Sequence, residues 1–137
     1  MRISLKLDYA QRAVLQLAKG YDGKTVARLD DISEKESIPS SFLDQILTDL
    51  KKANIVVSKR GKAGGYLLAQ NPGEITLAAI IDAVEPQLLE EASGFEGESA
   101  SALTSVWKEL SKGFANKVGK ITIEELLSNE REPMWFI

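Results

Sequence analysis

The chain has 137 residues, of which 44% are hydrophobic and 27% are charged, enough for one globular domain with a buried core. It contains no cysteine and no histidine, which excludes disulfides, thiolate nucleophiles, histidine bases, and the Cys/His sites that hold zinc or iron–sulfur clusters. The net charge of −3 is unevenly spread: residues 1–71 hold 12 Lys/Arg against 8 Asp/Glu, while residues 72–137 hold 5 against 12. A net negative charge does not prevent the basic half from binding DNA, because salt screens the charge of the acidic half beyond about 10 Å.

The chain begins Met1-Arg2-Ile3-Ser4-Leu5-Lys6, with charges where a secretory signal peptide would have its apolar core. No apolar run approaches the roughly 20 residues that a membrane-spanning helix needs. We therefore expect a cytoplasmic protein. The sequence also lacks the glycine-rich phosphate-binding motifs and the G-x-S-x-G nucleophile motif, so we do not expect an enzyme.

Apolar residues recur at helical spacing in the first half of the chain and predict three helices. The first runs from about Ser4, a candidate N-cap, to Gly20, a candidate C-cap. The second spans Leu29 to Glu36, and the third runs from about Ser40 to Ala53. Because only the short break Ser37-Ile38-Pro39 separates the last two, they form a helix-turn-helix pattern.

A β-hairpin is predicted next, because the β-rich runs Ile55-Val56-Val57 and Tyr66-Leu67-Leu68 flank a glycine-rich segment. Lys59, Arg60 and Lys62 place three cations on this hairpin. A basic hairpin after a helix-turn-helix is typical of a winged helix, and we call it the wing. An arginine at its tip suits the narrow, electronegative minor groove of DNA.

The second half of the chain predicts further helices around one loop. Thr76 can cap a short helix that ends near Val84, and residues from about Gln87 to Ser101 form a loop rich in Glu, Ser and Gly. A long helix follows from about Ala102 to Lys117. Its apolar stripe consists of Leu103, Val106, Trp107, Leu110 and Phe114. Thr122-Ile123-Glu124-Glu125 fits a capping box for a last short helix.

The predicted fold class is mainly α with a small β-hairpin, a winged helix-turn-helix followed by a long C-terminal dimerisation helix. We divide the chain into a DNA-binding domain over residues 1–85, a loop over 86–101, and a dimerisation segment over 102–137. The chain ends with Pro133-Met134-Trp135-Phe136-Ile137, an apolar tail that must dock on a surface if it is ordered.

The candidate DNA-contacting residues lie on the third helix and on the wing. Polar side chains opposite the buried stripe of that helix can donate to phosphates or bases. Gln45 can pair at two points with adenine, and Asp44 can accept from the amino group of cytosine. The full set is Arg2, Ser40, Ser41, Asp44, Gln45, Thr48, Lys52, Lys59, Arg60 and Lys62. The alternative interpretation is a plain solvated helix face and an ordinary charged turn.

The stripe of the long helix also has two interpretations. It packs on the N-terminal helices, or it lies against its counterpart in a second subunit. The small size of the chain, the aromatic stripe and the apolar tail favour the second. A symmetric dimer would also place two recognition helices in adjacent major grooves.

An ordered series of segments carries a family resemblance. The segments are Tyr9-Ala10, Ile32 to Ile38, Phe42 to Leu47, Arg60-Gly61, Gly64 to Ala69, Ile75 to Leu77, Ala83 to Glu85, Trp107 and Ile121 to Leu126. Over about residues 1–127 the chain resembles the Rrf2-like family of bacterial transcription regulators. The resemblance implies a homodimeric winged-helix repressor or activator with the long helix as the dimer interface. By position it implies base or groove contacts for Ser41, Asp44, Gln45 and Arg60.

The chain departs from this family in three places. Asp8 stands where many members carry Arg, and Lys62-Ala63 replace a frequent Pro-Gly of the wing. Cluster-binding members carry three cysteines in the loop before the long helix; this chain has none, and Ser101 lies about where the last would be. Because serine does not replace a thiolate on iron, we expect no iron–sulfur cluster and no other cofactor. The loop then binds a small effector, senses through a partner protein, or only connects.

Two hypotheses for function follow. The leading one is a DNA-binding transcription regulator, taken as a repressor, which acts as a homodimer on a palindromic operator without a cluster. The alternative is a winged-helix module that regulates a partner protein through direct interaction and does not bind DNA.

Overall fold

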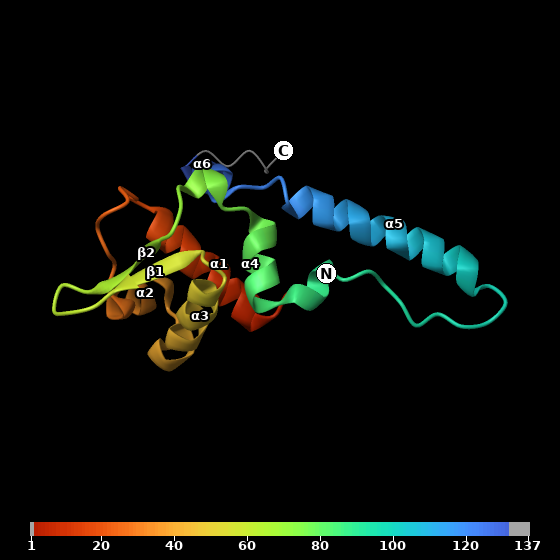
Figure 1. Cartoon of the computed structure of the whole chain (residues 1–137), viewed down its shortest axis with the longest axis horizontal. Coiled ribbons are helices and arrows are strands. Elements are labelled where there is room, and N and C mark those ends of the chain that lie inside the picture. Colours follow the sequence, from red (N-terminus) through yellow and green to blue (C-terminus); the bar gives the residue numbers. More distant parts are fainter. Residues whose placement is uncertain (1, 132–137) are drawn as a thin grey trace.

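The computed structural model describes residues 2–131, so the apolar tail predicted to dock lies outside the described residues. The described chain is mainly helical with one two-stranded antiparallel sheet, which confirms the predicted fold class (Figure 1). Its elements are α1 (Leu5–Ala18), α2 (Leu29–Glu36), α3 (Ser40–Lys52), β1 (Val56–Lys59), β2 (Gly65–Leu68), the 3-10 turn η1 (Pro72–Glu74), α4 (Leu77–Val84), the 3-10 turn η2 (Pro86–Leu89), α5 (Ala100–Val118) and α6 (Ile123–Arg131). Within these residues no helix is both long and apolar enough to cross a membrane.

The core forms where α1, α3 and α4 meet, and it uses the apolar faces that helical spacing predicts. Leu7 and Val14 of α1 are fully buried, as is Ile80 of α4. The third helix buries one stripe completely: Leu43, Ile46, Leu47 and Leu50. Each fully buried aliphatic side chain of this kind stabilises the fold by about 1.5–3 kcal/mol. Ile38, in the turn before α3, is also buried and belongs to this core.

Local hydrogen bonds set the helix ends. Ser4 Oγ accepts from the Leu7 N–H at 3.1 Å and caps α1, as predicted. Thr122 Oγ1 accepts from the Glu125 N–H at 3.1 Å, and a Glu125 carboxylate oxygen accepts from the Thr122 N–H at 3.2 Å, which confirms the capping box. The prediction for Gly20 was wrong by one position: Lys19 is the C-cap of α1, and Gly20 follows it at a φ of 72°.

Arg12 ties the first three helices together. Its guanidinium donates to the Glu36 carbonyl at the end of α2, and to the Asp8 carboxylate at 3.0 Å within α1. It also lies 5.1 Å from the ring centroid of Tyr9, whose ring packs edge-to-face with that of Phe42 of α3, with centroids 5.4 Å apart. The Asp8 carboxylate is therefore paired with Arg12, at a partly exposed position.

The long helix α5 extends away from the winged-helix body, at the end of the molecule opposite the hairpin (Figure 1). Its C-terminal end is fastened to the body, because the Leu77 N–H donates to the Ile121 carbonyl at 2.8 Å and the Ile123 N–H donates to the Ile75 carbonyl at 2.9 Å. The loop prediction for Gln87 to Ser101 was wrong at both ends. Pro86 starts η2, and α5 begins at Ala100, so Ser101 lies in its first turn.

Asp22 closes the turn between α1 and α2. Its carboxylate accepts from the backbone N–H groups of Lys24 at 2.8 Å and Thr25 at 2.7 Å, and from the Thr25 hydroxyl at 2.6 Å. These bonds, that of the Thr25 hydroxyl foremost, lower the pKa of Asp22 from 3.8 to about 2. The ionised carboxylate therefore favours the folded chain.

This lowered pKa predicts the pH dependence of one variant. Because the folded pKa is depressed, the charge contributes stability above a pH of about 4 and loses it as the pH falls through about 2. Asp22→Asn should lower the urea midpoint at neutral pH, and its difference from the wild type should shrink as the pH falls from about 4 through about 2. A difference that stays constant over this range would show that the charge has no role in the turn.

Candidate nucleic-acid interface

The exposed face of α3 carries the polar residues that were predicted from the sequence to contact DNA. Ser40, Ser41, Asp44, Gln45, Thr48 and Lys52 are all exposed, opposite the buried apolar stripe. The Ser40 hydroxyl donates to the Ser33 hydroxyl at 3.2 Å, and the Thr48 hydroxyl donates to the Asp44 carbonyl at 2.9 Å. Among residues 2–131, the side chains of Ser41, Gln45 and Lys52 make no hydrogen bond, so this face is ready to accept a ligand.

Arg2 is exposed just before α1, as the prediction requires of a phosphate contact. The neighbouring cation, Lys6, pairs with Asp49 of α3 at 2.7 Å. Of the two cations at the start of the chain, Arg2 is therefore the better phosphate candidate, and Lys6 instead joins α1 to α3.

Glycines shape the tip of the wing, residues 60–64. Gly61 has a φ of 102°, and the Gly64 N–H donates to its carbonyl at 2.9 Å to close the turn. A Cβ on Gly64 would lie 2.3 Å from the Lys59 carbonyl oxygen, and one on Gly65 would lie 2.4 Å from the Ala27 carbonyl oxygen. The side chains of Arg60 and Lys62 are exposed on this turn, which matches their predicted position.

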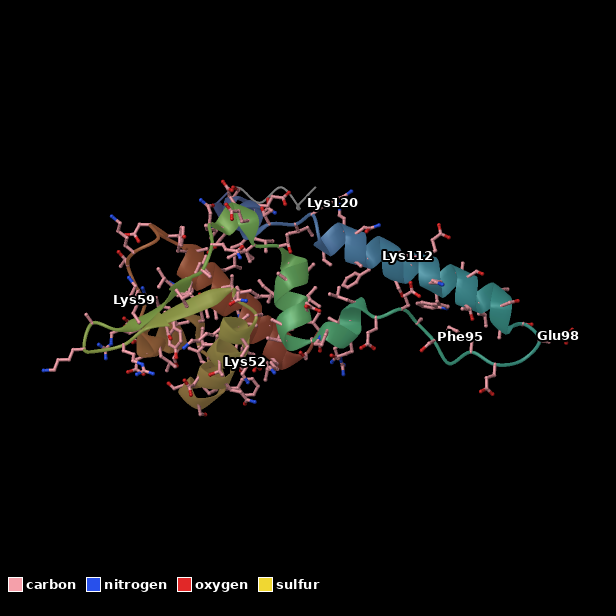
Figure 2. The ribbon with its side chains drawn as sticks, in the orientation of Figure 1. Lys52, Lys59, Phe95, Glu98, Lys112 and Lys120 are labelled. Carbon is pink, nitrogen blue, oxygen red and sulfur yellow. The ribbon has the colours of Figure 1, made fainter. Side chains whose placement is uncertain are left out.

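The segment before α2 holds the wing along one edge. Ala27 and Tyr66 exchange two backbone hydrogen bonds of 2.8 Å, so this segment joins the hairpin through an isolated antiparallel bridge. The Arg28 guanidinium donates to the Lys62 carbonyl at 2.9 Å. The Lys59 ammonium donates to the Lys24 carbonyl at 3.3 Å, so this cation faces the loop before α2 rather than the tip (Figure 2).

The wing and α3 form one surface. The Lys51 ammonium at the end of α3 donates to the Ser58 hydroxyl of β1 at 2.7 Å. The pKa of the Tyr66 hydroxyl is raised above its ordinary value, first by burial and second by the Asp44 carboxylate. An exposed polar helix face and a basic wing therefore lie side by side.

The apolar stripe of α5 is open to solvent in a single chain. Leu103, Val106, Trp107 and Leu110 are between 47% and 57% exposed, although they are large and apolar. Phe114 differs: it is half-buried and packs against the core at the base of the helix. A shallow groove beside the stripe is lined by Val106, Glu109, Leu110, Gly113 and Phe114. A patch of this kind typically marks a protein interface.

Comparisons with known proteins agree with this geometry. The family model for Rrf2, described as an iron-dependent transcriptional regulator, matches residues 3–129. IscR of Xenorhabdus nematophila, an HTH-type transcriptional regulator, is 34% identical over 134 residues that cover 95% of this chain and 81% of that protein. The solved structure of CymR, the global cysteine regulator of B. subtilis, has a TM-score of 0.81 and 27% identity, and covers 93% of this chain and 97% of that one. IscR of T. potens has a TM-score of 0.78 and 28% identity, covering 100% and 93%.

The iron in that family description has no fitting ligand set in this chain. There is no cysteine or histidine anywhere in the sequence to supply a thiolate or an imidazole. Within residues 2–131 there is no group of three His, Cys, Asp or Glu that could hold a metal ion. Two contacts join the loop between η2 and α5 to the α5 helix. A Glu91 carboxylate oxygen lies 3.9 Å from the Lys108 ammonium, and the Ala92 N–H donates to the Ser111 hydroxyl at 3.4 Å.

Proposed function

The chain belongs to the Rrf2 family of transcriptional regulators, and we propose that it acts in the cytoplasm as a homodimeric repressor that binds a palindromic operator without an iron–sulfur cluster. The observation that carries this proposal is the pairing of an exposed polar α3 face with an anchored basic wing on one surface. Such a surface matches a duplex, in which a helix fits the major groove and a cation fits the adjacent minor groove.

In this proposal α3 is the recognition helix. Gln45 pairs with adenine through its amide, and Ser41 donates to a base edge or a phosphate. Asp44 repels phosphates, so it must face bases, where it accepts from the amino group of cytosine. Arg60 enters the minor groove beside the helix. Arg2, Ser40, Thr48, Lys52 and Lys62 hold the duplex in register through its backbone, whereas the Lys59 ammonium binds the Lys24 carbonyl instead.

The proposed dimer uses the stripe of α5. In a two-fold symmetric dimer, the α5 helices of the two chains would pack against each other. The stripe of each chain would then be covered by the stripe of the other: Leu103, Val106, Trp107 and Leu110. Phe114, at the base, would complete the groove that receives the partner helix. Because α5 lies at the far end from the wing, pairing leaves both DNA-binding surfaces free (Figure 1). Half-sites would then lie about 34–36 Å apart, one helical turn of DNA.

The signal that releases this regulator from DNA is proposed to act without a cluster. The loop between η2 and α5 joins the winged helix to the dimerisation helix, so a small effector or a partner protein bound there would change how the two surfaces are arranged. The absence of thiolate and imidazole donors from the sequence supports this part of the proposal.

Arg60→Ala tests the wing. We expect a loss of about 1–3 kcal/mol in operator binding, and a slope of log affinity against log salt that falls by about one unit. The measurement is a fluorescence anisotropy titration at several salt concentrations. Lys120→Ala is the matched control, because this exposed cation lies near the C-terminal end of α5, away from the wing (Figure 2). Equal affinity for both variants and the wild type would remove the wing from the mechanism.

A gel shift separates the proposal from the alternative of a protein-interaction module. The proposal predicts that the wild type shifts its own upstream promoter DNA, or a duplex selected from a randomised pool. No shift at low salt, together with recovery of one stable partner protein, would support the alternative instead.

A further inference from the structure

We propose that Arg28 is a positioning residue for the wing, whose guanidinium fixes the tip in the orientation that presents Arg60 to DNA. This inference rests on the proposed function, because it names a residue through which the same interface works. Arg28 precedes α2 and belongs to neither the recognition helix nor the hairpin. Its proposed role rests on one long-range hydrogen bond and on the backbone contacts that hold the segment around Arg28 in place.

The tip has few attachments. Inside the hairpin, the Gly64 N–H donates to the Gly61 carbonyl and closes the turn around Lys62 and Ala63. Beyond the hairpin, the Arg28 Nη1 donates to the Lys62 carbonyl at 2.9 Å. Among residues 2–131 this is the one hydrogen bond that joins residues 60–64 to a residue outside the hairpin.

Apolar packing does not replace this bond. Residues 60–63 are all exposed, so no buried side chain holds the tip in place. A hollow of about 200 Å³ separates the tip from the start of α2, and its lining includes Arg28, Gly61 and Gly64. The side chain of Arg28 therefore spans this hollow, from the start of α2 to the Lys62 carbonyl of the tip. The tip and the start of α2 do not pack closely against each other there.

The segment that carries Arg28 is bound to β2 by backbone hydrogen bonds. Its neighbour Ala27 exchanges two hydrogen bonds with Tyr66, and the Ala27 carbonyl packs directly against Gly65. The backbone at Arg28 is thus fixed to β2, on one side of the turn, while its guanidinium binds the middle of the turn. A charge-assisted hydrogen bond from a fixed base is suited to orienting an exposed loop, which otherwise keeps its conformational entropy. Arg60 lies two residues from the carbonyl that Arg28 holds.

The alternative role for Arg28 is a direct phosphate contact. The two roles predict different energetic coupling between Arg28 and Arg60 in DNA binding. A phosphate contact contributes independently of Arg60, so the two effects add. A positioning residue acts through Arg60, so its effect disappears once Arg60 has been removed. A double-mutant cycle separates them.

The experiment uses the full chain and a duplex selected from a randomised pool. Arg28→Met, which keeps the apolar stem and loses the donors, is expected to weaken binding about tenfold in the wild type, but less than about twofold in the Arg60→Ala background. Lys24→Met is the matched control, because it removes a charge from the same segment while the wing binds the Lys24 carbonyl and not its side chain. It should weaken binding less than about threefold.

A second readout needs no DNA. In the free Arg28→Met variant, ¹⁵N relaxation at Gly61, Lys62 and Gly64 is expected to show lower order than in the wild type, while the thermal midpoint stays unchanged. Unchanged relaxation at the tip, or equal losses of affinity in both backgrounds, would overturn the positioning role. If no duplex is selected by the wild type, the proposed function fails, and the relaxation result still decides whether Arg28 fixes the tip.

Discussion

Replacing Leu110 with aspartate is expected to convert the proposed dimer into a monomer and to abolish tight operator binding. Leu110 is the most exposed member of the α5 stripe, at 57%, and lines its groove. In the proposed dimer each carboxylate would be buried opposite its symmetry mate, and burial of an unpaired charge costs several kcal/mol. A monomer then contacts one half-site only, so affinity for a palindromic duplex falls by orders of magnitude.

Sedimentation equilibrium gives the oligomeric state of Leu110→Asp, and a gel shift gives its binding. Ser105→Asp is the matched control, because helical spacing places it on the opposite side of α5 from the stripe. It should remain dimeric and bind like the wild type. A dimeric Leu110→Asp protein would refute the α5 interface, whatever its DNA binding. A monomeric one with full operator affinity would refute the need for a dimer.

Gly65→Ala is expected to deform the wing, lower the free energy of unfolding by about 1–3 kcal/mol and weaken DNA binding at least about tenfold. The added Cβ would lie 2.4 Å from the Ala27 carbonyl oxygen and 2.8 Å from its carbon. Both atoms belong to the backbone, so no side-chain rotation relieves the overlap. Either β2 or the segment before α2 must move, which breaks the paired hydrogen bonds between Ala27 and Tyr66.

Urea unfolding and anisotropy titration measure the two effects of Gly65→Ala. Ala63→Ser, at an exposed position of the same turn, is the matched control and should change neither quantity appreciably. Wild-type stability in Gly65→Ala would mean that the segment before α2 does not clamp the wing. Weakened stability with full DNA affinity would mean that wing geometry is not needed for binding.

Features fixed by local sequence were predictable. The bounds of α2 agree with the prediction, because the buried Ile32 and the half-buried Leu29 share one face and Ser37-Ile38-Pro39 ends the helix. Ser4 and Thr76 cap their helices because a hydroxyl at that position reaches an N–H three residues on. The relatives are transcriptional regulators, which confirms that the chain is a regulator and not an enzyme.

Features that depend on distant contacts were not predictable. The Arg28 contact spans 34 residues, and nothing near Arg28 in the sequence indicates it. Lys59 looked like a free cation of the wing, but a carbonyl 35 residues away holds its ammonium. The start of α5 was misplaced because Ala100 to Ala102 add no apolar periodicity. The pairing of Asp8 with Arg12 could have been found, since the two residues stand four apart on one helix face.

Native mass spectrometry of the protein with one selected duplex tests the central claim most directly, because one spectrum reports chain number, DNA binding and any bound iron or sulfide. The account predicts a complex of two chains and one duplex, with no added mass, from protein purified under anaerobic conditions. A complex with one chain per duplex, a cluster-sized mass increment, or no DNA complex at low salt would contradict it.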